Sequence, residues 1–220
     1  MSFDETWEKI FSERPWGKYP NEDVIRFVMR HFSKAADRKS IRILDLGCGG
    51  GAHAWFLARE GFDVYALDGS ESAVGQTKKL LEQNNLSAQL QVGDMNRLDY
   101  PSDFFDAVVD NNSIQHNRWA DILKTHLEIR RVLKAEGRLL SIMLNEGTTG
   151  SETAEKIEEG TFKNFKKGLI TTGVLAHLTS KAELDILSRS LQDVSVETVT
   201  RETLGATISH YVLTAQNRKL

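Results

Sequence analysis

A nine-residue stretch from Ile43 to Gly51, ILDLGCGGG, constrains the fold more than any other part of this sequence. Its apolar residues lead directly into four glycines within five positions. Glycine reaches positive φ at little cost and has no Cβ to keep a ligand away from the backbone. A helix that begins just after such a turn points free N–H groups at whatever lies there. The stretch therefore predicts a buried strand, a tight turn and a helix over residues 51–60, with a small-molecule site at the turn.

From residue 41 onward, strand-like and helix-like segments alternate along the chain. Short apolar runs indicate the strands, and apolar residues at helical spacing indicate the helices between them. We expect strands at residues 41–46, 63–67, 89–92, 105–109 and 138–144, and helices at residues 51–60, 71–84 and 119–133. Strands that alternate with helices predict an α/β fold with a parallel sheet and helices on both of its faces.

We interpret the whole chain, 1–220, as one domain in four parts: a helical N-terminal cap (1–40), a core (41–144), an insertion (145–178) and a C-terminal part (179–220). The run RPWGKYP interrupts the cap, because prolines and glycine do not fit inside a helix. The insertion is polar and rich in Gly and Thr, so it is either a lid over the sheet or a long surface loop with one short helix. The C-terminal part predicts a helix at 181–190 and two neighbouring antiparallel strands at 194–200 and 206–214.

Composition sets limits on the class of protein. The chain has 28 basic and 31 acidic residues, a formal net charge of −3 and a single cysteine, Cys48. This balance gives no argument for a nucleic acid or membrane partner, and one cysteine cannot form a disulfide within the chain. The first residues lack an apolar signal-peptide segment, and no apolar run is long enough to span a membrane. We expect a cytoplasmic monomer or homodimer that binds a small molecule and has no metal site.

Two acids near the glycine loop indicate which small molecule it binds. Gly47, Gly49 and Ala52 satisfy the dinucleotide pattern G-x-G-x-x-A, which alone leaves a nicotinamide cofactor open. Asp68 ends the next strand and can accept both hydroxyls of an adenosine ribose. Asp45 lies just before the first glycine, where it would repel a pyrophosphate and attract an ammonium or sulfonium group. This charge argument favours S-adenosylmethionine over NAD.

A third acid follows the third predicted strand. Gly93, Asp94 and Met95 stand there in sequence. Asp94 can accept a hydrogen bond from the amino group of adenine while the apolar Met95 covers the ring. A turn or helix-cap residue is the alternative interpretation of Asp94.

The sequence at this point resembles the class I S-adenosylmethionine-dependent methyltransferases. The resemblance covers residues 40–145 and rests on the acid-x-G-x-G-x-G motif together with Asp68 and Asp94. It implies a Rossmann-like, seven-stranded, mostly parallel sheet whose last strand is antiparallel. It also implies that the cofactor leaves as S-adenosylhomocysteine. The cofactor-binding residues that it implies are Asp45, Gly47, Cys48, Gly49, Gly51, Asp68, Gly69, Asp94, Met95, Asp110 and Asn111.

For the transfer itself, the family chemistry is an in-line displacement in which alignment matters most and a base matters only when the acceptor must lose a proton. Two histidines are candidate catalytic residues: His116, in the loop after the fourth strand, and His177, at the end of the insertion. Loop structure or pocket lining is the alternative interpretation. Trp16 and Tyr19, in the break of the cap, are candidate substrate-binding residues, with packing against the core as the alternative. His53 lies in the first helical turn after the glycine loop, where it could meet the methionine carboxylate of the cofactor; a position on the helix surface is the interpretation that we favour.

The acceptor class follows partly by elimination. The run after the fourth strand, DNNS, is not the Asn-Pro-Pro-Tyr type found in amino-methylating DNA enzymes, and no basic stripe indicates RNA. We therefore expect a small-molecule acceptor with a hydroxyl or amine, of sugar or metabolite type. The alternatives are an NAD(P)-dependent oxidoreductase, a non-catalytic subunit that binds S-adenosylmethionine, and an RNA methyltransferase with a partner.

Overall fold

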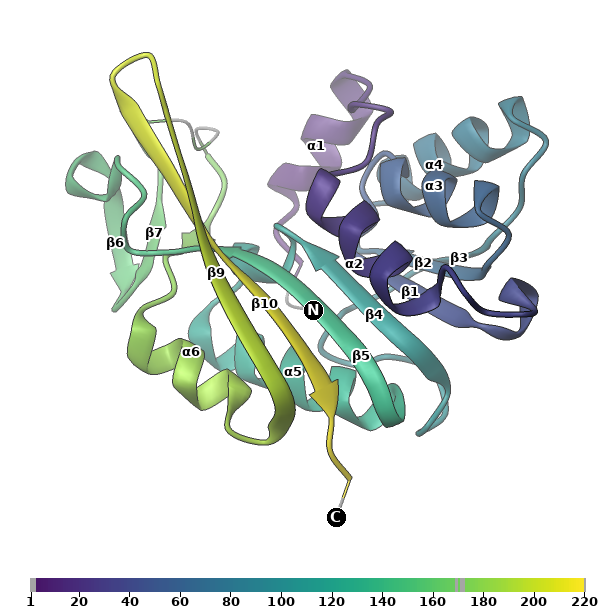
Figure 1. The fold of residues 1–220 in the computed structure, drawn as a ribbon. Coiled ribbons are helices and arrows are strands. Elements are labelled where there is room, and N and C mark those ends of the chain that lie inside the picture. The colour runs from purple at the N-terminus through teal and green to yellow at the C-terminus, as the bar shows by residue number, and fades with distance from the viewer. Residues whose placement is uncertain (1–2, 169, 171–172, 220) are drawn as a thin grey trace.

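The computed structural model describes residues 3–168, 170 and 173–219. Its centre is a seven-stranded sheet in the order β3-β2-β1-β4-β5-β10-β9, with helices on both sides (Figure 1). The strands of this sheet are β1 (Arg42–Leu46), β2 (Asp63–Asp68), β3 (Gln89–Val92), β4 (Phe105–Asn111), β5 (Leu133–Leu144), β9 (Leu191–Thr203) and β10 (Ala206–Asn217).

The direction of the strands confirms the predicted fold class. Strands β3, β2, β1, β4 and β5 pair in parallel. Strand β10 lies between β5 and β9 and runs antiparallel to both. The fold is therefore a Rossmann-like, mostly parallel sheet with an antiparallel last strand, as the resemblance implies.

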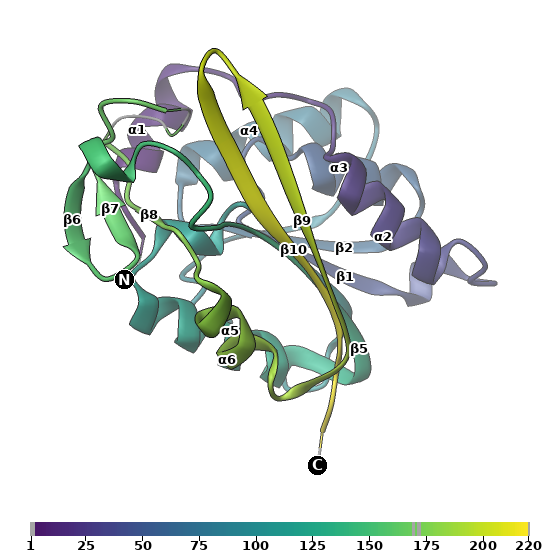
Figure 2. The same ribbon diagram turned by 60° about the vertical axis from the view of Figure 1, so that its left-hand side comes forward.

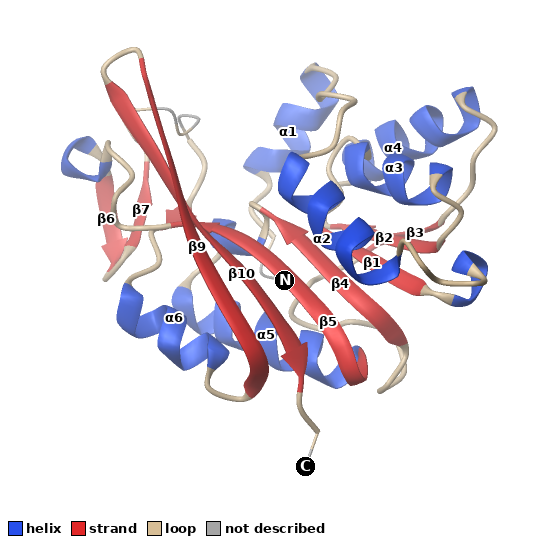
Figure 3. Cartoon of the chain, in the orientation of Figure 1, coloured by secondary structure: helices blue, strands red, loops and turns tan. Residues whose placement is uncertain are grey.

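Helices cover the two faces of the sheet (Figure 3). Helices α2, α3 and α4 lie on one face, and α5 and α6 lie on the other (Figure 1). The helices are α1 (Thr6–Glu13), α2 (Glu22–Phe32), α3 (Ala52–Arg59), α4 (Glu71–Gln83), α5 (Trp119–Val132) and α6 (Lys181–Ser188).

The central strands are apolar on both faces because both faces are covered. In β1, Ile43 packs in the cluster under α2 and α3, while its neighbour Leu44 packs in the cluster under α5 and α6. In β4, Val109 packs in the cluster under α2 and α3, and Val108 packs in the cluster under α5 and α6. All four side chains are fully buried. A strand with this environment gives the continuous apolar run from which the sequence analysis began.

Several predicted strand boundaries are wrong at the C-terminal side of the core. Strand β5 begins at Leu133, directly after α5, whereas the sequence predicts a strand only from residue 138. Of the extra residues, Leu133 pairs with Phe105 of β4; the register then shifts, and the pairing resumes at Arg138 opposite Ala107. The last two strands are also longer than predicted and form an extended hairpin.

The insertion contains a second, smaller sheet, which neither of the two interpretations of this segment predicts. Strands β6 (Glu155–Glu158), β7 (Thr161–Lys163) and β8 (Ala176–His177) pair antiparallel. The helical structure that the described residues show there is a single 3-10 turn at Ser151–Thr153. Phe165 is fully buried and packs with Leu144 and Leu178, so the insertion has its own small core against the end of β5.

None of the helices in the part of the chain that the structure describes is long and apolar enough to cross a membrane.

Helix α5 carries a buried histidine that makes stability depend on pH. His126 packs on the face of α5 that carries Ile122 and Ile129, and its Nε2 atom has no hydrogen-bond partner. Burial lowers the pKa of His126 to about 4. The unfolded chain, with an ordinary histidine pKa near ~6.5, therefore binds more protons than the folded chain in the window between these two values. The contribution of His126 to stability is complete above this window and decreases as the pH falls through it.

We predict that His126→Leu removes part of this pH dependence. The free energy of unfolding of the wild type should lose about 2 kcal/mol more than that of the variant when the pH falls from about 7 to about 5. Urea unfolding at both pH values measures the difference. An equal loss in both proteins would show that His126 is not protonated preferentially in the unfolded chain.

Candidate active site

A cavity of about 590 Å³ lies at the carboxyl ends of β1, β2 and β4. This edge of an open α/β sheet is where ligands bind in such folds. Residues far apart in sequence form the walls: the glycine loop, the ends of β2 and β4, the N-terminal residues, and the β9–β10 hairpin. A cavity of this size is in the range of small-molecule sites.

Two contacts fix the shape of the glycine loop: Gly47 lies against Ser113, and Gly49 is hydrogen-bonded to Asp68. Gly47 has a φ of 73°, and a Cβ there would lie 2.3 Å from the side chain of Ser113. Gly49 has a φ of 51°, and its N–H donates to Oδ2 of Asp68 at 2.9 Å. Only glycine adopts these positive φ values without strain and also leaves room for the side chain of Ser113. The loop after β1 is thus packed against the segment that follows β4.

Asp68 connects the loop after β1 to the loop after β2. Its Oδ1 accepts the N–H of Ser70 at 2.9 Å, while Oδ2 accepts that of Gly49. Burial raises the pKa of Asp68, and the backbone hydrogen bonds from Ser70 and Gly49 oppose that change. The carboxylate lines the cavity. Each oxygen retains acceptor capacity beyond its one backbone bond.

Most of the predicted cofactor and substrate residues are brought together on the cavity wall. This set is Gly47, Cys48, Gly49, Asp68, Gly69, Asp94, Met95 and Asn111, with Trp16, Tyr19 and His116.

Three predicted cofactor residues lie behind the wall instead. Asp45 is buried and accepts the N–H of Ala54, in the first turn of α3, at 3.0 Å. Asp110 accepts the N–H groups of Ser113 and Ile114. Burial raises its pKa to about 6. A Cβ on Gly51 would lie 2.7 Å from Thr77 of α4, so this glycine permits helix packing. The structure therefore places these three residues beneath the site, as supports of the loops.

The N-terminal segment covers the glycine positions with aromatic rings. A Cβ on Gly69 would lie 2.2 Å from the ring of Phe3, and one on Gly50 would lie 2.8 Å from Trp16. Phe11 lies over Gly49 in the same manner. The cap therefore closes on the loop because the loop has no side chains there. Helical spacing in the sequence predicts α1, but it does not show that Phe3 and Phe11 line a cavity.

Helix α1 is held in this place by polar contacts with its neighbours. Glu8 accepts hydrogen bonds from the hydroxyl of Ser70 at 2.6 Å and from the N–H of Ser72 at 3.2 Å, at the N-terminus of α4. A carboxylate is favourable at a helix N-terminus. On the other side, Lys163 of the insertion pairs with Asp4 at 3.3 Å. Figure 2 shows α1 between α4 and the small sheet.

The geometry of the cavity fits an adenosine-bearing cofactor at this end. The wall presents glycine backbone without side chains, a two-oxygen acceptor in Asp68, and the pair Asp94 and Met95 after β3. Within the described residues, no group of three or more His, Cys, Asp or Glu side chains could hold a metal ion.

Comparison with known proteins agrees with this arrangement. A family profile described as a methyltransferase domain matches residues 43–137, which contain the glycine loop, Asp68 and Asp94. Residues 43–137 thus match a methyltransferase domain, and the comparisons support the class I S-adenosylmethionine-dependent methyltransferase family. S-adenosylmethionine is its cofactor.

Individual relatives are similar over most of this chain. Methyltransferase phqN of Penicillium fellutanum is 27% identical over 85% of this chain and 56% of its own length. A ubiquinone biosynthesis O-methyltransferase of Cereibacter sphaeroides is 27% identical over 78% of this chain and 71% of its own length. A S-adenosylmethionine-dependent methyltransferase structure from Methanosarcina mazei has a TM-score of 0.69 at 22% identity, over 81% of this chain and 93% of its own, which shows a shared fold. The chain thus spans little more than half the length of the first of these relatives.

His116 reaches the cavity of this methyltransferase domain as a neutral imidazole. Its Nδ1 lies 2.7 Å from the carbonyl oxygen of Leu175, an acceptor, so Nδ1 carries the hydrogen and Nε2 is an acceptor. The side-chain amide of Gln115 donates a long hydrogen bond, of 3.4 Å, to this Nε2. Burial lowers the pKa of His116 to about 4. The ring of Trp7 packs edge-on at 4.6 Å. The orientation of His116 therefore depends on both the insertion and the cap.

His177 is not brought to the cavity. It is fully buried, with Nδ1 2.8 Å from the hydroxyl of Thr161 and Nε2 3.2 Å from Glu183, and it stacks on Trp119. Both ring nitrogens are occupied by the small sheet and the start of α6. This environment is that of a structural residue, so His177 has no part in the function proposed below.

Several residues of the cavity wall were not predicted from the sequence. His53 is buried rather than on a helix surface, and its Nε2 accepts the N–H of Asn21 at 3.3 Å. Asn21 also donates to Asn111 at 3.0 Å, which ties the start of α2 to the end of β4. Arg201 and His210 reach the cavity from the hairpin. The sequence predicts Arg201 in the connection between the last two strands and His210 within the second of them, and nothing in the sequence places the hairpin over the cavity.

We predict that Glu8→Ala loosens the cap while the fold is retained. Loss of the hydrogen bonds to Ser70 and Ser72 should speed amide hydrogen exchange in α1 by about tenfold. Exchange in β1 and β4 should not change. Glu13→Ala is the matched control, since Glu13 lies on the same helix and pairs only weakly with Lys9, at 3.9 Å in an exposed position. Equal exchange in the two variants would contradict the role of Glu8.

Proposed function

We propose that this chain transfers the methyl group of S-adenosylmethionine to a hydroxyl or amine of a small molecule of sugar or other metabolite type. The observation that carries the proposal is the cavity itself. It continues from Asp68 and Asp94 at one end to His116 and the hairpin at the other, so a cofactor and a small acceptor can share it. A relative named as a ubiquinone biosynthesis O-methyltransferase supports methyl transfer to an oxygen.

We assign the cofactor contacts as follows. Asp68 accepts hydrogen bonds from the ribose hydroxyls, because it lines the cavity and both of its oxygens retain acceptor capacity. Asp94 and Met95 hold the adenine, and the backbone at Gly47 and Gly49 borders the methionine part. When bound, S-adenosylmethionine supplies an electrophilic methyl group.

The protein contributes alignment, exclusion of water and acceptance of a proton. Phe11 and Trp16 close the cavity above the glycine loop, which keeps water from the reacting groups. His116 presents the unprotonated Nε2 for the proton that the acceptor hydroxyl or amine loses. A cytoplasmic location remains a prediction.

Asp68→Ala should weaken binding of S-adenosylhomocysteine at least about tenfold, because charged hydrogen bonds to the ribose are lost. Titration calorimetry measures this affinity, with Asp63→Ala as the control at the opposite end of the same strand, where Asp63 faces Arg42 at 3.8 Å. Unchanged affinity in Asp68→Ala would contradict the ribose assignment. Binding of NAD or NADP by the wild type in place of S-adenosylhomocysteine would favour the oxidoreductase alternative.

His116→Asn should lower kcat and leave the affinity for S-adenosylhomocysteine unchanged. Asparagine can still donate to the carbonyl of Leu175 but lacks the Nε2 acceptor. Since the pKa of His116 is lowered to about 4, turnover of the wild type should be insensitive to this group above about pH 5 and should fall below it as the imidazole is protonated. The assay follows release of S-adenosylhomocysteine with a panel of small hydroxyl and amine compounds. Full activity of the variant would assign His116 a structural role.

A further inference from the structure

The end of the β9–β10 hairpin extends beyond the rest of the sheet (Figure 3). The last pair between β10 and β5 is His210 with Leu144, and residues 206–209 of β10 pair only with β9. Each residue of a strand advances the chain by about 3.4 Å, so this two-stranded ribbon overhangs the carboxyl ends of the central strands. That edge of the sheet is the one with the cavity.

The insertion holds the ribbon in place along its β10 edge. The hydroxyl of Thr148 donates to the carbonyl of Ser209 at 2.9 Å and accepts the N–H of Ser209 at 3.0 Å. Thr149 exchanges the same kind of contacts with Thr207. Four hydrogen bonds from two neighbouring threonines position the ribbon, so the side chains that it carries have a defined place.

Arg201 is the cation that this ribbon brings to the cavity wall. It pairs directly with Ile208 across the hairpin, so both side chains lie on one face, and both line the cavity. Arg201 is exposed, and its side chain makes no hydrogen bond or ion pair with any other residue that the structure describes. Its guanidinium is always charged and presents several donors in a fixed plane.

His210 lies beside Arg201 on the same face of the hairpin and also lines the cavity. Burial lowers the pKa of His210, and the charge of Arg201 lowers it further, while Asp23 has the opposite effect. His210 is therefore neutral at pH 7, and it adds hydrogen-bonding capacity without a second charge.

The charges are divided between the two ends of the cavity. Asp68 and Asp94 belong to the cofactor end, and Arg201 belongs to the hairpin end. Two further acids line the cavity, and each faces a cation: Asp4 pairs with Lys163 at 3.3 Å, and Glu22 lies 3.8 Å from Arg26. An acceptor that fills the hairpin end thus meets a guanidinium that has no carboxylate partner among the described residues.

We propose that the methyl acceptor carries an anionic oxygen group, a carboxylate or a phosphate, which Arg201 binds with His210 beside it. Arginine binds both groups through paired, charge-assisted hydrogen bonds. The inference rests on the proposed function, because it concerns the acceptor end of the same cavity. It assigns Arg201 as a specificity-determining residue.

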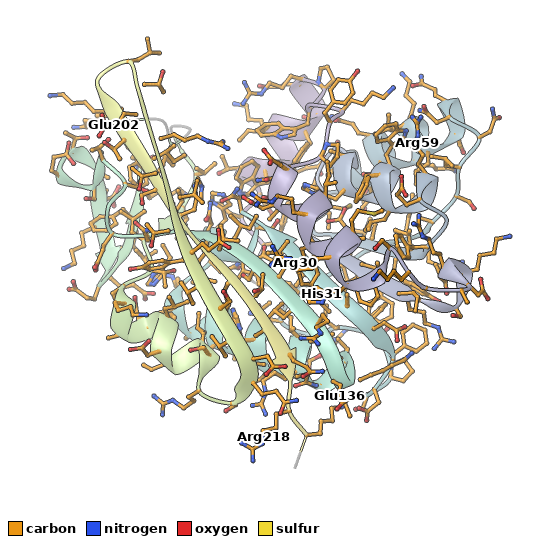
Figure 4. All side chains as sticks on the ribbon, in the orientation of Figure 1. Arg30, His31, Arg59, Glu136, Glu202 and Arg218 are labelled. Carbon is orange, nitrogen blue, oxygen red and sulfur yellow. The ribbon has the colours of Figure 1, made fainter. Side chains whose placement is uncertain are left out.

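The test measures binding of three ring-bearing probes to protein saturated with S-adenosylhomocysteine. Benzoate and phenyl phosphate carry the anionic group, and benzamide is the neutral counterpart of benzoate. Titration calorimetry is performed on the wild type, Arg201→Gln and Arg218→Gln. Arg218 is an exposed arginine near the C-terminus, far from the ribbon that carries Glu202 (Figure 4).

We expect the wild type and Arg218→Gln to bind at least one of the two anions at least about tenfold more tightly than benzamide, and Arg201→Gln to lose this preference. The anion that binds more tightly distinguishes a carboxylate from a phosphate acceptor. Anions that bind no better than benzamide, or a preference that persists in Arg201→Gln, would overturn the inference, as would no detectable binding of either anion.

The proposed function has a separate readout in the same experiment. Failure of the wild type to bind S-adenosylhomocysteine would contradict the proposed function itself. Normal binding of S-adenosylhomocysteine without an anion preference would contradict only the inference about Arg201.

Discussion

The carboxylate of Asp68 is the contact on which the architecture of the site depends. It accepts N–H groups from the loop after β1 and from the loop after β2, at 2.9 Å each. The two loops are thereby held side by side at one edge of the sheet, and the backbone of both faces the cavity. Because the carboxylate is nearly buried, losing a partner would leave a charge without compensation. The same group thus organises the protein and presents acceptors to the cofactor.

Ser70 links this contact to the N-terminal cap. Its N–H donates to Asp68, its hydroxyl caps α4 by accepting the N–H of Ala73, and the same hydroxyl donates to Glu8 of α1. A chain of hydrogen bonds therefore runs from the glycine loop to the helix that covers it. The insertion reaches the same region from the other side, through Lys163 and Leu175. The site is assembled from four separate parts of the chain, so its shape depends on how they pack.

Much of the fold could be predicted because local patterns report local structure. Alternation of strands and helices predicts the sheet core, and the ends of parallel strands predict Asp68 and Asp94 as cavity residues, while Asn111 came from the family resemblance. The role of Asp45 could not be predicted from local patterns. Its position before the first glycine is compatible with a ligand contact or with a bond to the following helix, and only the fold shows that Ala54 takes the carboxylate. His177 is a similar case, because burial under Trp119 cannot be read from its neighbours in the sequence.

The sequence by itself determined the α/β core, the glycine turn and the kind of cofactor, since these follow from the spacing of residues that are close together in the chain. Tertiary structure alone decided what surrounds the cofactor. Phe3 lies over Gly69, Leu175 orients His116, and Arg201 reaches the cavity on an overhanging ribbon. Each of these contacts joins residues more than fifty positions apart. No local pattern encodes such pairs, because they depend on the register of β10 in the sheet and on the packing of the cap and the insertion against its edge.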